Sequence, residues 1–148
     1  MVPAIALLVV TLAARLAGWL GWHYTDTWAA ATAVGLAAMF VLTGVAHFVQ
    51  PRRAGLIAIV PPRLPAPGLL VTITGILEPA GAVGLLIPVT RVAAAACLFV
   101  LMVAMFPANI YAAGARRSEH SPETPLVART LLAVLFLCGA ALVAVGGV

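Results

Sequence analysis

The sequence predicts an all-α protein, a transmembrane helical bundle, and three observations point to that fold class. Hydrophobic residues make up 64% of the 148 residues and charged residues only 8%, whereas a soluble domain has about 45–50% and about 25%. The apolar residues form five runs, each close to the roughly 20 residues that a helix needs to span a bilayer. None of the runs alternates polar and apolar residues, so helices are favoured over the strands of a membrane barrel.

The five predicted helices cover residues 2–22, 28–49, 68–87, 92–113 and 126–145, and together they form one membrane domain over 1–148. Arg15 interrupts the first run and Glu78 the third. We interpret the first run as a helix of the mature protein, because residues 1–4 lack the positive charge of a signal peptide. Charged or proline-rich segments separate the runs.

The loop 50–67 is basic, apolar and rich in proline, at positions 51, 61, 62, 65 and 67. It predicts a short helix at the membrane surface and then a rigid return into the third span. Such a segment serves as a lid or a docking surface, or as a simple connector. The loop 114–125 is polar and is interpreted as a solvated linker.

The arginines set the expected orientation, because the chain has eight of them and no lysine. Loops 50–67 and 114–125 hold most of the arginines, whereas the loops on the other side, 23–27 and 88–91, hold only Arg91. The positive-inside rule therefore predicts a multi-pass protein of the cell inner membrane, in contact with the lipid bilayer, with its N-terminus in the cytoplasm. Aromatic residues flank the first external loop, as at a membrane interface (Trp19, Trp22, Tyr24, Trp28).

The sequence lacks the motifs of a nucleic-acid surface, a disulfide relay and a metal site. The arginines are dispersed in pairs at helix ends, without the aromatic-interleaved stripe of a nucleic-acid surface. Cys97 and Cys138 form no C-x-x-C motif, so a disulfide relay is disfavoured and both are interpreted as small hydrophobic residues. The three histidines have no metal-ligand spacing, so no metal site is expected.

Glu78 is the first candidate site residue, because an ionisable side chain at membrane depth is costly and by default suggests a function. Its helix face carries small residues (Thr74, Gly75, Gly81, Ala82), which predicts a close contact with another helix. Pro79 leaves the Gly75 carbonyl without its helical donor, so we expect a kink and a small cavity or proton-titratable site. The alternative is a carboxyl group that only locks the bundle.

Arg15 is the expected partner of Glu78. Counted from the predicted cytoplasmic helix ends, the two residues lie 13 and 10 positions into their helices, so their depths differ by about 5 Å. An arginine side chain spans that gap, and pairing would lower the insertion cost of both charges. The alternative is that the Arg15 side chain extends to the membrane surface.

His47 and Asn109 are predicted to share a depth near the cytoplasmic ends of the second and fourth helices. They lie two and four positions from residues 49 and 113, close enough for a direct or water-mediated bridge. We expect them, with the arginine-rich loop, to form the mouth of a polar pocket whose floor is Glu78. The alternative is hydrogen bonding that only terminates the two helices.

Four segments carry a family resemblance, namely 44–48 (GVAHF), 60–65 (VPPRLP), 74–91 (TGILEPAGAVGLLIPVTR) and 106–109 (FPAN). They resemble the DoxX-like family of small bacterial integral membrane proteins, over roughly residues 35–145. The resemblance implies a four-helix transmembrane core, to which the first helix is an N-terminal addition. It also implies redox-complex subunits as partners, since named relatives include a subunit of a membrane thiosulfate–quinone oxidoreductase.

Three function classes follow. We favour a non-catalytic subunit or scaffold of a membrane redox system that binds a partner or a small apolar ligand such as a quinone. A proton-coupled transporter of small hydrophobic solutes that uses Glu78 is the alternative; it lacks inverted repeats and would have to form a homo-oligomer. A redox enzyme is disfavoured, because the helices carry no paired histidines that could hold haem. We therefore expect no catalytic residue and no cofactor other than a quinone.

Overall fold

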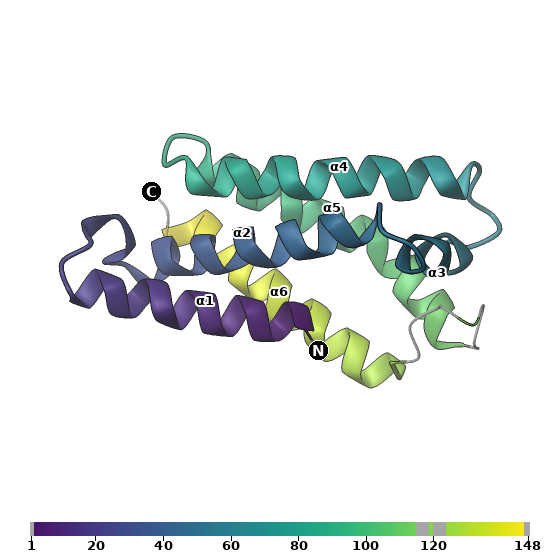
Figure 1. Cartoon of the computed structure of the whole chain (residues 1–148), viewed down its shortest axis with the longest axis horizontal. Coiled ribbons are helices and arrows are strands. Elements are labelled where there is room, and N and C mark those ends of the chain that lie inside the picture. The colour runs from purple at the N-terminus through teal and green to yellow at the C-terminus, as the bar shows by residue number, and fades with distance from the viewer. Residues whose placement is uncertain (1, 115–118, 120–123, 147–148) are drawn as a thin grey trace.

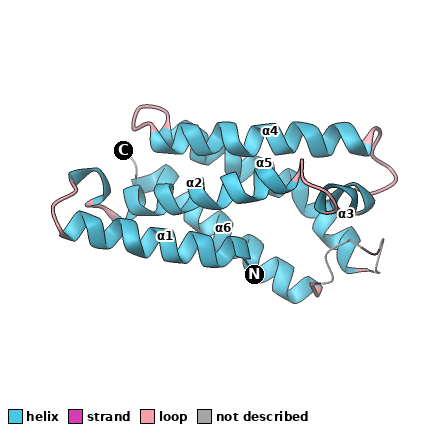
Figure 2. Cartoon of the chain, in the orientation of Figure 1, coloured by secondary structure: helices cyan, strands magenta, loops and turns pink. Residues whose placement is uncertain are grey.

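The computed structural model describes residues 2–114, 119 and 124–146, and within these ranges every regular element is helical. The elements are α1 (Val2–Trp19), η1 (His23–Thr25), α2 (Trp28–Ala46), α3 (Arg52–Ala58), α4 (Pro67–Leu86), α5 (Arg91–Ala113) and α6 (Leu126–Gly146). The predicted all-α class is confirmed (Figure 2). Helices α1, α2, α4, α5 and α6 are long and apolar enough to cross a bilayer, so the protein is a membrane protein built as a helical bundle.

The observed helix ends differ from the predicted ends mainly in the first two spans. Helices α4, α5 and α6 begin and end within one residue of the expected positions, whereas α1 and α2 each stop three residues early. Gly21, just beyond α1, has a φ of 105°, a left-handed conformation that cannot continue a helix. Pro51 follows α2 after a short turn and has no N–H group to extend the helical hydrogen bonding.

Helix α2 is the central element of the bundle. It packs against α1, α4 and α6, while α5 packs against α4 and α6. Figure 1 shows α1, α2 and α4 side by side along the long axis, with α1 and α4 on different flanks of α2. The first half of α2 is rich in buried alanine, and these small side chains allow neighbouring helices to approach on more than one side.

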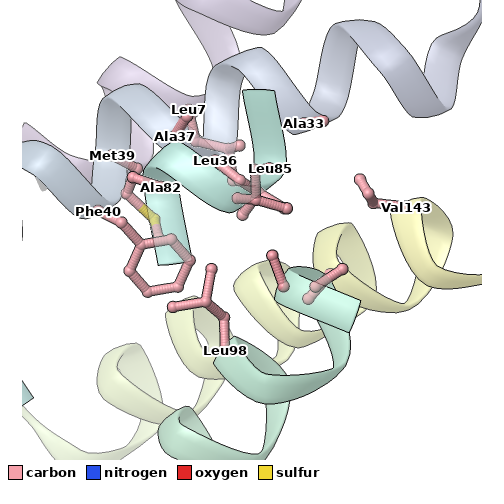
Figure 3. Close-up of a cluster of buried hydrophobic side chains, with 13 residues drawn as sticks. Leu7, Ala33, Leu36, Ala37, Met39, Phe40, Ala82, Leu85, Leu98 and Val143 are labelled. Atoms are coloured by element: carbon pink, nitrogen blue, oxygen red, sulfur yellow. The ribbon is translucent and has the colours of Figure 1, made fainter. Parts of the chain in front are cut away.

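The apolar core lies where these helices meet (Figure 3). Leu7 of α1, Leu36 and Phe40 of α2, Leu85 of α4 and Leu98 of α5 converge there with Val143 of α6 and several alanines. The outer surface is also apolar, with many exposed leucine, valine and isoleucine side chains. A surface of that kind fits a lipid environment, in which apolar side chains need not be covered by protein.

Helices α4 and α5 are close at the end of the bundle that carries η1 and separate toward the end that carries α3. A Cβ atom on Gly81 would lie 2.5 Å from Leu98 Cδ2, and one on Gly84 would lie 2.8 Å from Ala94 Cβ. Further along, α5 leads away from α4 (Figure 1). Helix α4 remains continuous through Pro79, and Figure 1 shows no sharp bend in it, so the expected kink is absent.

Candidate functional site

Glu78 faces α2 from the middle of α4 and is only 2% exposed. The Thr43 hydroxyl of α2 donates to Glu78 Oε2 at 2.5 Å. Thr43 Oγ1 also lies 3.2 Å from the Met39 carbonyl oxygen and 3.3 Å from that of Phe40. The hydroxyl has a single proton to donate, and its short contact with Oε2 holds the buried carboxyl group against α2.

His47, one turn beyond Thr43, is the second polar group at this position. Its Nδ1 lies 2.8 Å from the Thr43 carbonyl oxygen; a carbonyl oxygen only accepts, so Nδ1 carries a proton. Its Nε2 lies 3.9 Å from Glu78 Oε1. At 3.9 Å the two atoms are within ion-pair range but beyond hydrogen-bond distance.

Two glycines allow α2 and α4 to bring these side chains together. A Cβ on Gly75 would lie 2.5 Å from His47 Cβ, and a Cβ on Gly44 would lie 2.6 Å from the ring of Pro79. The Gly75 carbonyl oxygen would be 3.4 Å from the same added atom on Gly44. The predicted close contact on the small-residue face of Glu78 is therefore present, and α2 is the helix that makes it.

A cavity of about 420 Å³ lies next to this pair, in the space that opens where α5 diverges from α4. Ligand sites of small molecules commonly measure about 300–1,000 Å³. Helices α2, α4 and α5, together with α3 and the segment after it, supply the walls. Of the 21 lining residues, 16 are apolar and five are polar (Thr43, His47, Thr74, Glu78, Asn109). The structure thus brings Glu78, His47 and Asn109 to one cavity, as predicted, but that cavity is mainly apolar.

Asn109 lines the cavity from α5 and is held by α6. Arg129 Nη1 donates to Asn109 Oδ1 at 3.2 Å, and Arg129 Nε donates to the Thr124 carbonyl oxygen at 2.8 Å. Because arginine only donates, the Asn109 oxygen must face Arg129, and its NH₂ group remains as the donor end. Within the described residues no direct hydrogen bond joins His47 to Asn109.

Helix α3 and the following segment form one wall of the cavity. A lid was one of the three roles considered for this segment. Leu56, Ile59 and Val60 face the cavity from this side. Arg53 attaches the segment to its neighbours. Its Nη1 donates to the His47 carbonyl oxygen at 2.8 Å, and its Nη2 donates to Thr72 Oγ1 at 2.9 Å. One guanidinium group therefore links α3 to the end of α2 and to the first turns of α4.

The predicted ion pair between Arg15 and Glu78 is wrong. The Arg15 guanidinium lies over Trp19 and Trp28, whereas Glu78 contacts Thr43 and His47. Trp28 and Thr43 are 15 residues apart on α2, or about 22 Å along the helix. Counting depth from each helix end assumed that the ends are level, but α4 extends further toward the α3 end than α1 does (Figure 1).

Two arginines are part of the site. The loop that contains Arg53 was expected at the mouth of the pocket, whereas Arg129 was given no role there; each donates to groups at the cavity wall. The position of Arg53, two residues after Pro51 and six after His47, is a signal that could have indicated contact with that helix end. No signal in the sequence pairs Arg129 with Asn109.

The remaining candidate groups lie elsewhere. Cys97 and Cys138 are free and exposed on the outer surface of the bundle. Among the residues that the structure describes, no group of three or more histidine, cysteine, aspartate or glutamate side chains could hold a metal ion.

Residues 36–144 match the model of a family described as a domain of unknown function (DUF8561). The matched region runs from the middle of α2 to α6 and includes Thr43, His47, Glu78 and Asn109. Neither the curated proteins nor the solved structures contain a match to the chain.

Proposed function

The chain belongs to the family of the DUF8561 domain, and we propose that it binds a small apolar ligand with a hydrogen-bonding head group in the cavity beside Glu78. In this proposal the protein is a non-catalytic subunit or scaffold of a membrane redox system, and the ligand is a quinone. The redox association rests on the resemblance of segment 74–91 to the DoxX-like family, which also suggests redox-complex subunits as partners.

The observation that carries the proposal is the cavity of about 420 Å³, with its apolar walls and its one buried pair of titratable groups. Apolar walls favour an apolar ligand, and a few convergent polar groups orient it. Here the polar groups lie at two places, with the His47 and Glu78 pair on one side and Asn109 on the other.

The residues present fit a quinone head group. Quinone carbonyls only accept hydrogen bonds, so a site for them needs donors in apolar surroundings. The NH₂ group of Asn109 is such a donor, and the His47 and Glu78 side chains add polar groups at the other position. Met102 and Phe40 supply apolar contact surface in the cavity wall.

A matched pair of substitutions on adjacent residues of α5 tests the cavity. Met102 lines it, whereas Val103 is 50% exposed on the outer surface. We expect a short-chain benzoquinone to bind the purified wild type, measured by calorimetry in detergent. Met102→Trp should abolish binding because the indole fills the space, and Val103→Trp should bind as the wild type does. Equal binding by both variants, or none by the wild type, would contradict the proposal.

Glu78 and His47 are tested separately with substitutions that keep the side-chain volume. Loss of one hydrogen bond to the ligand costs about 0.5–1.5 kcal/mol, so Glu78→Leu and His47→Leu should each weaken binding by up to about tenfold. Asp26→Asn, which changes an exposed acid outside the cavity, should have no effect. A quinone that binds the Glu78→Leu variant unchanged does not contact this pair.

The second candidate is a proton-coupled transporter of small hydrophobic solutes, and the arrangement of His47 and Glu78 favours it. The pair is buried and borders a cavity, and an ionisable side chain within a membrane span is the kind of group that proton relays use. Substrate-dependent proton release from the purified protein, lost in Glu78→Gln and kept in Asp26→Asn, would support transport. Absence of release in the wild type would count against it.

For the cellular setting we propose the cell inner membrane with the N-terminus in the cytoplasm. Support comes from the positive-inside rule, because the loops at the α3 end carry most of the arginines. In that orientation the ligand cavity opens in the cytoplasmic half of the membrane, on the side of α3.

A further inference from the structure

Arg15 lies in an aromatic setting at the end of the bundle opposite the cavity. Its guanidinium carbon is 4.8 Å from the centroid of the Trp19 ring and 5.6 Å from that of the Trp28 ring. The two indole rings meet edge to face, with 6.2 Å between their centroids. Trp19 ends α1 and Trp28 begins α2, so the two helices hold the arginine between them.

The charge of Arg15 has no counter-ion in the described part of the chain. Its Nε and Nη1 are buried without a hydrogen-bond partner, and its guanidinium carbon lies over the Trp19 and Trp28 rings. Asp26 is the acid nearest in sequence; it is exposed and forms no ion pair with Arg15. Only Nη2 remains accessible, so the guanidinium presents one donor atom and a full positive charge outward.

The surroundings of Arg15 are rigid. Gly18 lies against the η1 segment so closely that a Cβ there would be 2.3 Å from the Thr25 carbonyl oxygen, and Thr25 itself is completely buried. The Thr27 side chain accepts a hydrogen bond from the Ala30 N–H at 3.1 Å and so caps α2. These contacts hold the start of α2 against the end of α1, and with it the backbone that carries Trp28.

The depth of Arg15 in the bilayer indicates which kind of anion can bind it. Arg15 lies four residues before the end of α1, or about 6 Å along the helix, and tryptophan side chains mark the headgroup level of a bilayer. An arginine at that depth extends its charge toward the lipid phosphates. Next to it on α1, Leu12, one turn deeper, is 59% exposed and the adjacent Leu16 is 53% exposed, which provides an apolar surface for acyl chains.

We infer that Arg15, Trp19 and Trp28 form a binding site for the phosphate headgroup of an anionic phospholipid, in the leaflet at the η1 end. The exposed leucines on α1 favour a lipid over a free anion, because they would contact its chains. The site is independent of the cavity beside Glu78, from which it is separated by most of the length of α2.

The tryptophans provide a local signal for this site. The chain has three tryptophans, and all of them, Trp19, Trp22 and Trp28, lie at the η1 end. We would reconstitute the protein into phosphatidylcholine vesicles that contain a small fraction of brominated phosphatidylglycerol or, in parallel, brominated phosphatidylcholine. We expect the anionic lipid to quench tryptophan fluorescence with about a fivefold preference, the effect of one arginine near a membrane surface.

Variants assign that preference to Arg15. Arg15→Gln should remove it, whereas Arg52→Gln, which removes an exposed charge at the other end of the bundle, should keep it. Arg15→Lys keeps the charge but lacks the planar group that stacks on indole, so it should show an intermediate preference and covers the case in which Arg15→Gln does not fold.

Two results would overturn the inference. One is equal quenching of the wild type by the two brominated lipids. The other is loss of the preference when inorganic phosphate is added at constant ionic strength, because the site would then take a soluble anion and not a lipid.

Discussion

Gly75 is the position at which a single methyl group tests the packing that builds the site. A Cβ there would lie 2.5 Å from His47 Cβ and 2.9 Å from Phe48 Cε2, whereas ordinary contact begins at 3.4 Å. His47 Cβ is attached directly to the backbone, so it cannot rotate away and α2 must move by close to 1 Å. Overpacking of this kind costs about 1–3 kcal/mol, and the better helix propensity of alanine returns about 0.5–1 kcal/mol. We therefore expect Gly75→Ala to destabilise the protein by up to about 2.5 kcal/mol.

Gly139→Ala is the matched control for this substitution. It is also a glycine inside a helix, but a Cβ there would meet its nearest neighbours, Leu36 and Thr32, at 3.6 Å, which is ordinary contact. The difference between the two variants therefore isolates the packing cost. Unfolding in mixed micelles, followed by circular dichroism as sodium dodecyl sulfate is added, measures both free energies. Equal stability of Gly75→Ala and Gly139→Ala would refute the packing of α2 on α4 described here.

Two further predictions concern α3 and the orientation of the chain. Arg53→Gln should lower the free energy of unfolding by about 1–2 kcal/mol, because it loses charged hydrogen bonds, and should speed proteolysis of the segment after α3. The same change at the exposed neighbour Arg52 should alter the free energy of unfolding by no more than about 0.5 kcal/mol. Equal rates of proteolysis for the two variants would contradict the role of Arg53. For orientation, in a background without Cys97 and Cys138, a membrane-impermeant maleimide should label Val89→Cys on intact cells but not Arg52→Cys, and the reverse pattern would place the N-terminus outside.

The fold class and the number of spans could be predicted from the amino-acid sequence. In a bilayer the backbone must satisfy its own hydrogen bonds, so five apolar runs without alternation leave little choice other than helices. The same reasoning found Glu78, because an acid in the middle of an apolar run is conspicuous at any orientation of its helix. It also found His47 and Asn109, since Gly, Pro and polar residues near helix ends are visible in the chain.

The tertiary structure alone decided which polar groups meet. Arg15 and Glu78 have similar depths when each is counted from its own helix end, yet Arg15 contacts Trp28 and Glu78 contacts Thr43, at opposite ends of α2. The stagger and rotation of helices depend on how side chains and glycines of two surfaces fit together, as at Gly75 and His47. Composition and spacing along one chain do not contain that information, because it is a property of pairs of helix faces.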